Sequence, residues 1–93
     1  MRILEVLKEA RKRWVQEGED PIELIDKSGL LITKSYYWDG DTWRWDCVEI
    51  FDPRTKDVIE IYDEGQARLN GEWKELPELK DLLEHIFREA FWP

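Results

Sequence analysis

Apolar residues recur every three or four positions in the first segment of the chain, RILEVLKEARKRWVQEG, with charged residues between them. The apolar positions are Ile3, Leu4, Leu7, Ala10 and Trp14. This period is that of an amphipathic α-helix. Because the Gly18 that follows can adopt the left-handed conformation in which many helices end, we expect this helix to stop near Glu17.

The last segment carries the clearest helical pattern in the chain. Its apolar positions keep the same spacing without a break and are Leu79, Leu82, Leu83, Ile86, Phe87, Ala90 and Phe91. Pro77 stands just before them, and proline is well accepted in the first turn of a helix. The sequence therefore predicts a second helix that begins near Pro77 and turns one apolar side toward a core.

Between the two helices the pattern becomes that of strands joined by turns. Strands are predicted at residues 30–38, 42–51 and 58–62, rich in aromatic and β-branched side chains. The first turn is Asp39-Gly40-Asp41, where glycine and aspartate tolerate the positive φ of tight hairpins, and the second is DPRTKD. Consecutive strands with such short connections predict an antiparallel meander.

Two short segments leave alternatives open. Residues 22–25, IELI, either join the sheet or form a helical turn. Residues 67–69 allow a short edge strand, followed by a tight turn at Asn70-Gly71. Neither segment is long enough for its period to decide.

The predicted order of helix, three strands and helix is that of an α+β domain. Two helices with apolar sides would cover one face of the three-stranded antiparallel meander. A chain of 93 residues has enough surface to bury for one core only, so residues 1–93 are expected to form a single domain. The other face of the sheet would then lack a cover.

Four aromatic residues around the first turn are predicted to share one face of the sheet: Tyr36, Trp38, Trp43 and Trp45. A two-residue loop at Gly40-Asp41 pairs Trp38 with Trp43 and Tyr36 with Trp45. A loop at Asp39-Gly40 pairs Tyr36 with Trp43 instead. Either register leaves the four rings on the same side, because strand side chains alternate.

The apolar phase changes along the second strand. Trp43, Trp45 and Cys47 are at odd positions, whereas Val48 and Ile50 are at even positions. We interpret this as two faces that are both apolar in places, with the aromatic face outside the helix-covered core. Two outcomes stay open: the rings pack within the hairpin and core, or they are exposed and meet a partner or a second copy.

The chain is acidic, with 14 basic and 22 acidic residues and a net charge of −8. Residues 1–13 are basic, whereas residues 39–64 hold nine acidic and three basic residues. The acidic residues of this stretch are Asp39, Asp41, Asp46, Glu49, Asp52, Asp57, Glu60, Asp63 and Glu64. Such a surface repels nucleic acid and membranes and is attracted to basic proteins, so we expect a protein partner with a basic surface.

The same composition bears on where the protein works. A single cysteine, Cys47, cannot form an intrachain disulfide, and no apolar run approaches the roughly 18 residues of a membrane span. Glu5, Lys8 and Glu9 interrupt the segment that a signal peptide would need to be apolar. We therefore expect a cytoplasmic protein, and the scarcity of Asn and Gln is typical of thermophilic sources.

No motif of common cofactor, metal or nucleophile chemistry is present, so we expect no enzyme activity and no cofactor. His85 is expected on the polar, solvated side of the last helix. Cys47, in mid-strand among bulky neighbours, is expected to be a buried structural thiol. Asp39, Asp41 and Asp46 lack the ligand spacing of a calcium loop, so no metal site is predicted.

The predicted α-β-β-β-α order resembles that of double-stranded-RNA-binding domains over most of the chain. That resemblance implies a lysine cluster at the start of the second helix that grips phosphate. The corresponding EWKELPELKD has four acidic residues against Lys74 and Lys80. Because phosphate contacts supply most of the affinity for RNA, no direct binding of nucleic acid is expected.

The expected function is therefore binding to another protein. We expect an inhibitor or modulator of a nucleic-acid-handling protein, and in general character the chain resembles phage or mobile-element inhibitors such as anti-CRISPR and anti-restriction proteins. The expected partner-binding residues are Tyr36, Trp38, Asp39, Asp41, Trp43, Trp45 and Asp46. The alternatives are a homodimer that buries the aromatic face, and a ligand-binding or enzymatic domain with an aromatic pocket between sheet and helix.

Overall fold

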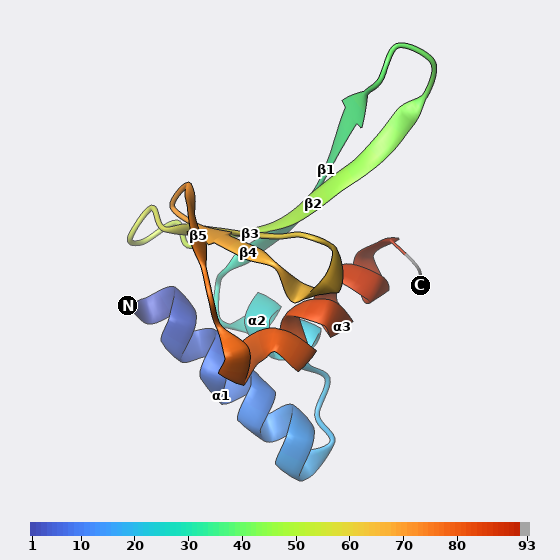
Figure 1. Ribbon diagram of the computed structural model, residues 1–93. Coiled ribbons are helices and arrows are strands. Elements are labelled where there is room, and N and C mark those ends of the chain that lie inside the picture. The colour runs from blue at the N-terminus through green and yellow to red at the C-terminus, as the bar shows by residue number, and fades with distance from the viewer. Residues whose placement is uncertain (92–93) are drawn as a thin grey trace.

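All three helices of the computed structural model lie on one side of a twisted antiparallel sheet (Figure 1). The structure describes residues 1–91, which form α1 (Arg2–Glu17), α2 (Pro21–Lys27), α3 (Lys80–Phe91) and two short 3-10 turns, η1 (Asp63–Gly65) and η2 (Pro77–Leu79). The predicted α+β class is confirmed. The predicted ends of the two long helices are also close to those observed, and Gly18 caps α1 with a φ of 68°.

The sheet has five strands in the described residues, in the order β1-β2-β3-β4-β5. They are β1 (Leu31–Trp38), β2 (Trp43–Phe51), β3 (Val58–Ile61), β4 (Ala67–Leu69) and β5 (Glu72–Lys74). The predicted three-stranded meander is therefore wrong in number. β4 is the short strand that the sequence allowed at residues 67–69, although β5 and not β4 forms the edge of the sheet; both are three residues long, which is too short to show an alternating pattern.

The open question about residues 22–25 is settled in favour of helix. Asp20 accepts a hydrogen bond from the backbone N–H of Ile22 at 3.0 Å, and Pro21 occupies the first turn. An aspartate N-cap followed by proline is a strong start for a helix. The resulting α2 places Ile25 in the core.

A single hydrophobic core fills the space between the helices and one face of the sheet. The sheet contributes Val48, Ile50, Ile59, Ile61, Ala67 and Leu69, and the helices contribute Ile3, Leu7, Ala10, Ile25, Leu82, Leu83, Ile86 and Phe87. Alternation along β2 and β3 therefore sends Glu49 and Glu60 to the opposite face.

A β-bulge on β2 explains the change of apolar phase. Ser35 pairs with Cys47 and the next residue, Tyr36, pairs with Trp45, so Asp46 has no opposite residue. Val48 is a core residue and pairs with Lys34, so Lys34 lies on the core side of β1, and alternation places Tyr36 and Trp38 on that side too. Their partners Trp45 and Trp43 therefore lie on the same side as the core residues of β2. The expectation that Trp43 and Trp45 lie outside the helix-covered face is wrong, because both continue that face; of the three odd-numbered residues only Cys47 lies on the opposite face.

The distal parts of β1 and β2 extend away from the body of the protein as a two-stranded ribbon (Figure 1). The molecule measures 43 × 28 × 24 Å along its principal axes, so it is distinctly elongated. The ribbon therefore carries the aromatic face beyond most of the helical layer.

Candidate binding surface

The projecting part of the β1–β2 hairpin, residues 36–46, is called here the aromatic arm. Trp38 pairs with Trp43 and Tyr36 pairs with Trp45, which is the register expected for a Gly40-Asp41 loop. The prediction that these four side chains share one face is confirmed. Tyr37 pairs with Arg44 and projects from the other face.

Asp39 builds the tip of the aromatic arm. Its backbone N–H donates to the carbonyl of Thr42 at 3.1 Å, and its Oδ1 accepts from the backbone N–H groups of Thr42 and Asp41, both at 2.9 Å. Its Oδ2 accepts from Nε of Arg44 at 2.6 Å. The Thr42, Arg44 and Asp41 bonds together lower the pKa of Asp39. This carboxylate is thus used within the turn, whereas the sequence suggested it would meet a partner.

The inner pair of rings is attached to the core through Phe91 at the end of α3. The ring of Trp45 lies nearly parallel to that of Phe91, at 5.3 Å and 21°, while Tyr36 meets Phe91 edge-on at 5.8 Å. Phe91 itself is buried and packs on Phe87 at 4.9 Å. Tyr36 and Trp45 are nevertheless 44% and 43% exposed, so they border the core without being part of it.

The outer pair of rings is more open. Trp38 and Trp43 meet at 5.6 Å with an interplanar angle of 66°, and they are 54% and 64% exposed. Within residues 1–91, each ring has its only aromatic contact with the other. Such an edge-to-face pair adds about 0.5–1.5 kcal/mol to the hairpin and leaves both rings accessible to a partner.

The one positive charge of the aromatic arm is paired internally, and the lysine just before the arm is directed to the end of α3. Lys34 donates to the carbonyl of Ala90 at 3.3 Å, near the end of α3, and Arg44 is paired with Asp39. Among the described residues, no hydrogen bond or ion pair involves the carboxylates of Asp41 and Asp46. The charges left available on the aromatic arm are therefore negative.

The remaining acidic residues of the 39–64 stretch are dispersed by the fold. Glu49 and Glu60 lie on the sheet face away from the helices. Asp57, in the β2–β3 turn, bonds with Thr55 of the same turn and with Asn70 of the β4–β5 turn. Asp52 is completely buried. The aromatic arm is thus accompanied by fewer free carboxylates than the sequence count suggested.

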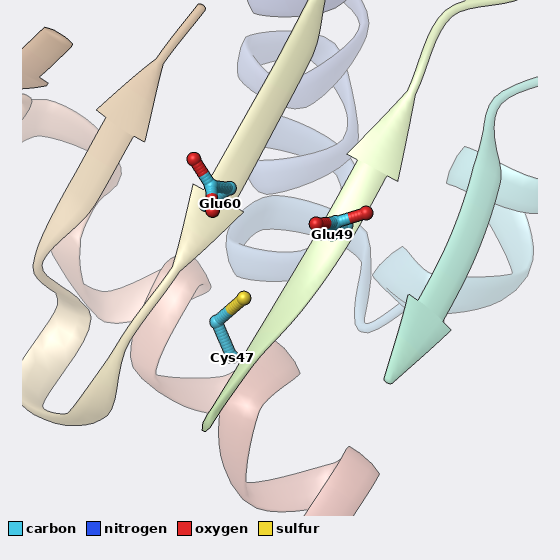
Figure 2. A group of neighbouring side chains, drawn as sticks. All are labelled: Cys47, Glu49 and Glu60. Atoms are coloured by element: carbon cyan, nitrogen blue, oxygen red, sulfur yellow. The ribbon is translucent and has the colours of Figure 1, made fainter. Parts of the chain in front are cut away.

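Three ionisable side chains gather on the sheet face away from the helices. Figure 2 shows Cys47 and Glu49 on β2 beside Glu60 on β3. One donor atom from each of these three side chains lies within 4.8 Å of the others. Burial raises the pKa of Cys47 to about 11, assisted by the charges of Asp46, Glu60 and Glu49. Cys47 is 1% exposed, which confirms the expected buried thiol.

This group has the residue types of a metal site but already has other partners. Glu60 accepts a hydrogen bond from the hydroxyl of Tyr62 at 3.1 Å and lies 3.8 Å from Nε of Arg68. A metal ion would have to displace the proton of Cys47 and compete with Arg68 for Glu60. We therefore assign it no metal. Sequence reasoning missed this group because only the register of β2 and β3 brings its members together.

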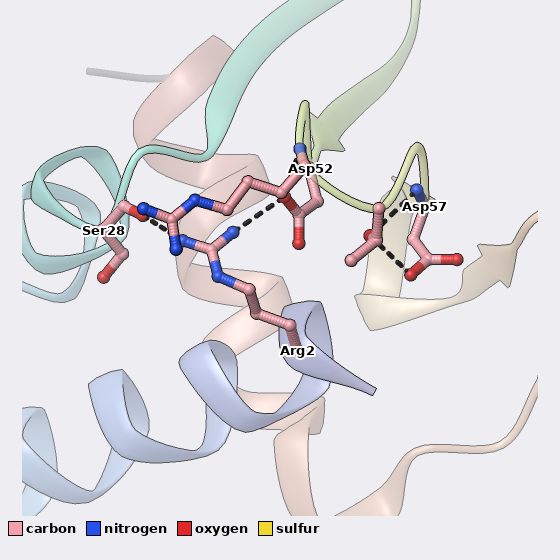
Figure 3. Close-up of polar contacts among 6 residues, drawn as sticks. Arg2, Ser28, Asp52 and Asp57 are labelled. Carbon is pink, nitrogen blue, oxygen red and sulfur yellow. Dashed lines mark hydrogen bonds and ion pairs between the residues drawn. The ribbon is translucent and has the colours of Figure 1, made fainter.

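Asp52 forms the most buried polar contact of the described residues. Its Oδ1 accepts from Arg2 at 2.7 Å and from the backbone N–H of Arg54 at 2.9 Å, while Arg2 also donates to the carbonyl of Ser28 (Figure 3). Burial acts to raise the pKa of Asp52, but the bonds to Arg2 and Arg54 outweigh it and lower the value. Arg2 thereby joins α1 to the end of α2 and to the β2–β3 turn.

A surface groove lies where β5 meets the start of α3. Its volume is about 610 Å³, and its lining includes Gln66, Trp73, Lys74, Leu76 and Lys80. None of the four rings on the shared face of the aromatic arm lines it. The alternative of an aromatic pocket between sheet and helix thus has Trp73 as an aromatic wall residue in this groove, and not the rings of the aromatic arm.

His85 is not simply a solvated surface residue, as the sequence suggested. Its ring stacks on Trp14 of α1 at 4.7 Å and 28°, and the side chain is half-buried. The contact joins α1 to α3, so the residue belongs to the packing between helices.

No family model matches the chain, and neither the curated proteins nor the solved structures contain a significant match. No helix among residues 1–91 is long and apolar enough to cross a membrane. The observed order, with α2 and five strands, also departs from the α-β-β-β-α order that resembled double-stranded-RNA-binding domains.

Proposed function

We propose that this protein is a small acidic module that binds another protein and occludes a basic, nucleic-acid-handling surface of its partner. It would act without enzymatic chemistry, as an inhibitor or modulator of the general kind represented by anti-CRISPR proteins. The observation that carries the proposal is the aromatic arm, which projects from the body and exposes Trp38 and Trp43 at its outer end.

The size of the exposed aromatic surface supports an interface. Five rings of the aromatic arm are between 43% and 64% exposed. Since a buried aromatic side chain covers about 150–250 Å², these rings offer roughly 500 Å², against about 800 Å² per partner in a standard interface. Tyr37 projects from the opposite face to the other four rings. A partner groove that encloses the aromatic arm would therefore cover rings on both faces.

The charge of the protein supports the choice of partner. A net charge of −8 on 93 residues produces a negative potential that accelerates encounter with a basic surface and repels phosphate backbones. Tryptophan and tyrosine then supply the short-range affinity, because they are enriched among interface hot spots. Because charge governs the encounter and the rings govern the affinity, the association rate should fall with salt and the dissociation rate should depend on the rings.

The test is affinity capture from a lysate of the source organism, with captured proteins identified by mass spectrometry. Wild type is compared with a Trp38→Ala/Trp43→Ala variant and with Trp73→Ala, a matched control whose ring is 60% exposed outside the aromatic arm. The expected result is a basic, nucleic-acid-handling protein that wild type and the control retain, the double variant loses, and added nucleic acid displaces. Equal capture by all three proteins would refute the proposed role of the aromatic arm.

A homodimer is the second candidate, and one observation favours it. β1 is an edge strand of the five-stranded sheet, so its outer backbone groups are not paired within the sheet. Exposed edges of this length are templates for strand pairing. The molar mass measured by light scattering at high micromolar protein concentration tests this candidate. A monomeric mass at that concentration excludes a stable homodimer.

A further inference from the structure

The outer rings of the aromatic arm have the geometry of a cation-binding surface. In the edge-to-face contact of Trp38 and Trp43, the edge of one ring meets the face of the other, so the pair cannot cover all of its π faces. The exposures of 54% and 64% agree with this arrangement. Tryptophan has the most favourable π face for a cation among the aromatic side chains.

The charges beside these rings favour the same kind of ligand. Arg44, the only basic residue of positions 36–46, is paired with Asp39; Lys34 lies before the aromatic arm, where it donates to the carbonyl of Ala90 and keeps its charge. Asp41 and Asp46 lie in the same hairpin, and no hydrogen bond or ion pair engages their carboxylates within the described part of the chain. A cation stacked on the rings would thus share the hairpin with two carboxylates that lie two residues before and three residues after Trp43, and their charges disfavour an anion.

We propose that the aromatic arm recognises arginine side chains of its partner, which stack on Trp38 and Trp43 and pair with Asp41 or Asp46. The inference rests on the proposed protein-binding function and adds which chemical group of the partner the aromatic arm recognises. Arginine fits better than lysine because its planar guanidinium stacks on an indole and still donates two parallel hydrogen bonds to a carboxylate. Lysine offers a point charge without that geometry.

The experiment uses three synthetic peptides of one length that differ only at the cationic positions, which hold arginine, lysine or the neutral isostere citrulline. Binding to the full chain is measured by calorimetry, and the indole N–H signals of Trp38 and Trp43 are followed by NMR. We expect the arginine peptide to bind most tightly and the citrulline peptide about 5- to 30-fold more weakly, from two exposed cation–π contacts. The indole signals of Trp38 and Trp43 should shift more than that of Trp73.

Two variants separate stacking from simple burial of apolar surface. Trp38→Leu/Trp43→Leu keeps apolar side chains but removes the π faces, so the preference for arginine over citrulline should fall to the part that Asp41 and Asp46 supply. Trp73→Ala should retain the whole preference. Circular dichroism checks that each variant is folded, which is expected because both outer rings are largely exposed.

Each other outcome overturns the inference in a recognisable way. Equal binding of arginine and citrulline peptides would mean that the aromatic arm anchors through apolar contacts, and the proposed function would stand. A leucine variant whose preference for arginine is undiminished would assign recognition to the carboxylates alone and refute stacking on the rings. No binding of any peptide at millimolar concentration would refute cation recognition, and the capture experiment would still decide the function. A dimer that dissociates in the leucine variant would show that a second copy occupies the arm, and both proposals would fall.

Discussion

The ring of Trp45 lies 5.3 Å from that of Phe91 and nearly parallel to it, which joins the projecting hairpin to the end of the last helix. Tyr36 meets the same phenylalanine edge-on. This contact divides the aromatic arm into an inner pair, supported by the core, and an outer pair of Trp38 and Trp43. The first prediction follows from that division.

Removal of Phe91 should destabilise the protein far more than removal of an outer ring. Phe91 is buried against Phe87 as well as the inner pair, so Phe91→Ala should lower the free energy of unfolding by about 3–5 kcal/mol. Trp43→Ala removes one exposed cross-strand contact and should cost about 0.5–1.5 kcal/mol. Urea unfolding curves measure both values. Similar losses in the two variants would contradict the division into inner and outer pairs.

The Arg2–Asp52 pair should make stability depend on pH in the acid range. Because the folded pKa of Asp52 lies below its ordinary value, its contribution is fully present above the unfolded pKa of about 3.9 and is lost as the pH falls through the folded pKa. Between pH 5 and pH 2, the free energy of unfolding should thus depend less steeply on pH for Asp52→Asn than for wild type. Identical slopes would show that this carboxylate titrates alike in both states.

Loss of Arg2 should be more damaging than loss of an exposed arginine. Arg2→Ala leaves Asp52 buried with one fewer partner and frees the carbonyl of Ser28, so Tm should fall by about 10 °C or more. Arg88→Ala is the control, because that side chain is exposed and, within residues 1–91, pairs only with Glu84, four residues earlier. Thermal unfolding at neutral pH measures both. A Tm loss for Arg2→Ala no larger than that of the control would contradict this account.

The thiol of Cys47 should resist alkylation in the native protein. Its pKa of about 11 leaves very little thiolate at neutral pH, and the side chain is buried. Iodoacetamide at pH 7.5 should therefore modify the native protein much more slowly than the urea-unfolded chain. Mass spectrometry over time provides the measurement, and equal rates in the two states would refute the expected burial.

Glu49 and Glu60 face each other across β2 and β3, and like charges in that relation oppose strand pairing. Glu49→Gln should therefore stabilise the protein by about 0.2–1 kcal/mol at neutral pH. It should also lower the pKa of Cys47, because one of the nearby negative charges is removed. Chemical denaturation and the pH dependence of alkylation test the two effects. Destabilisation by Glu49→Gln would show that this carboxylate has a stabilising partner in solution.

Local patterns were sufficient for the long elements. Helices α1 and α3 each keep an apolar period over three or more turns. Gly18 follows the first helix and Pro77 precedes the second, so the apolar period and the signals at the helix ends indicate the same two helices. The common face of the four hairpin rings followed from the alternation of side chains, whereas the glycine-containing turn left two registers open and the structure selects the one with a Gly40-Asp41 loop. The burial of Cys47 likewise followed from its place in the middle of a strand.

Short elements and long-range contacts were decided by tertiary structure. β5 has three residues and is a strand only because β4 lies beside it. The bulge at Asp46 changes which face the odd residues of β2 occupy, and a phase change in a sequence does not distinguish a bulge from two apolar faces.

The candidate binding surface was likewise determined in part by local sequence and in part by tertiary packing. The sequence by itself determined that Tyr36, Trp38, Trp43 and Trp45 share one face, because alternation is a local property of a strand. Only the tertiary structure decided that Phe91 supports the inner pair and leaves the outer pair exposed, because Phe91 is distant in the sequence and reaches the hairpin through packing of α3. Exposure depends on such non-local packing, so local patterns do not specify it.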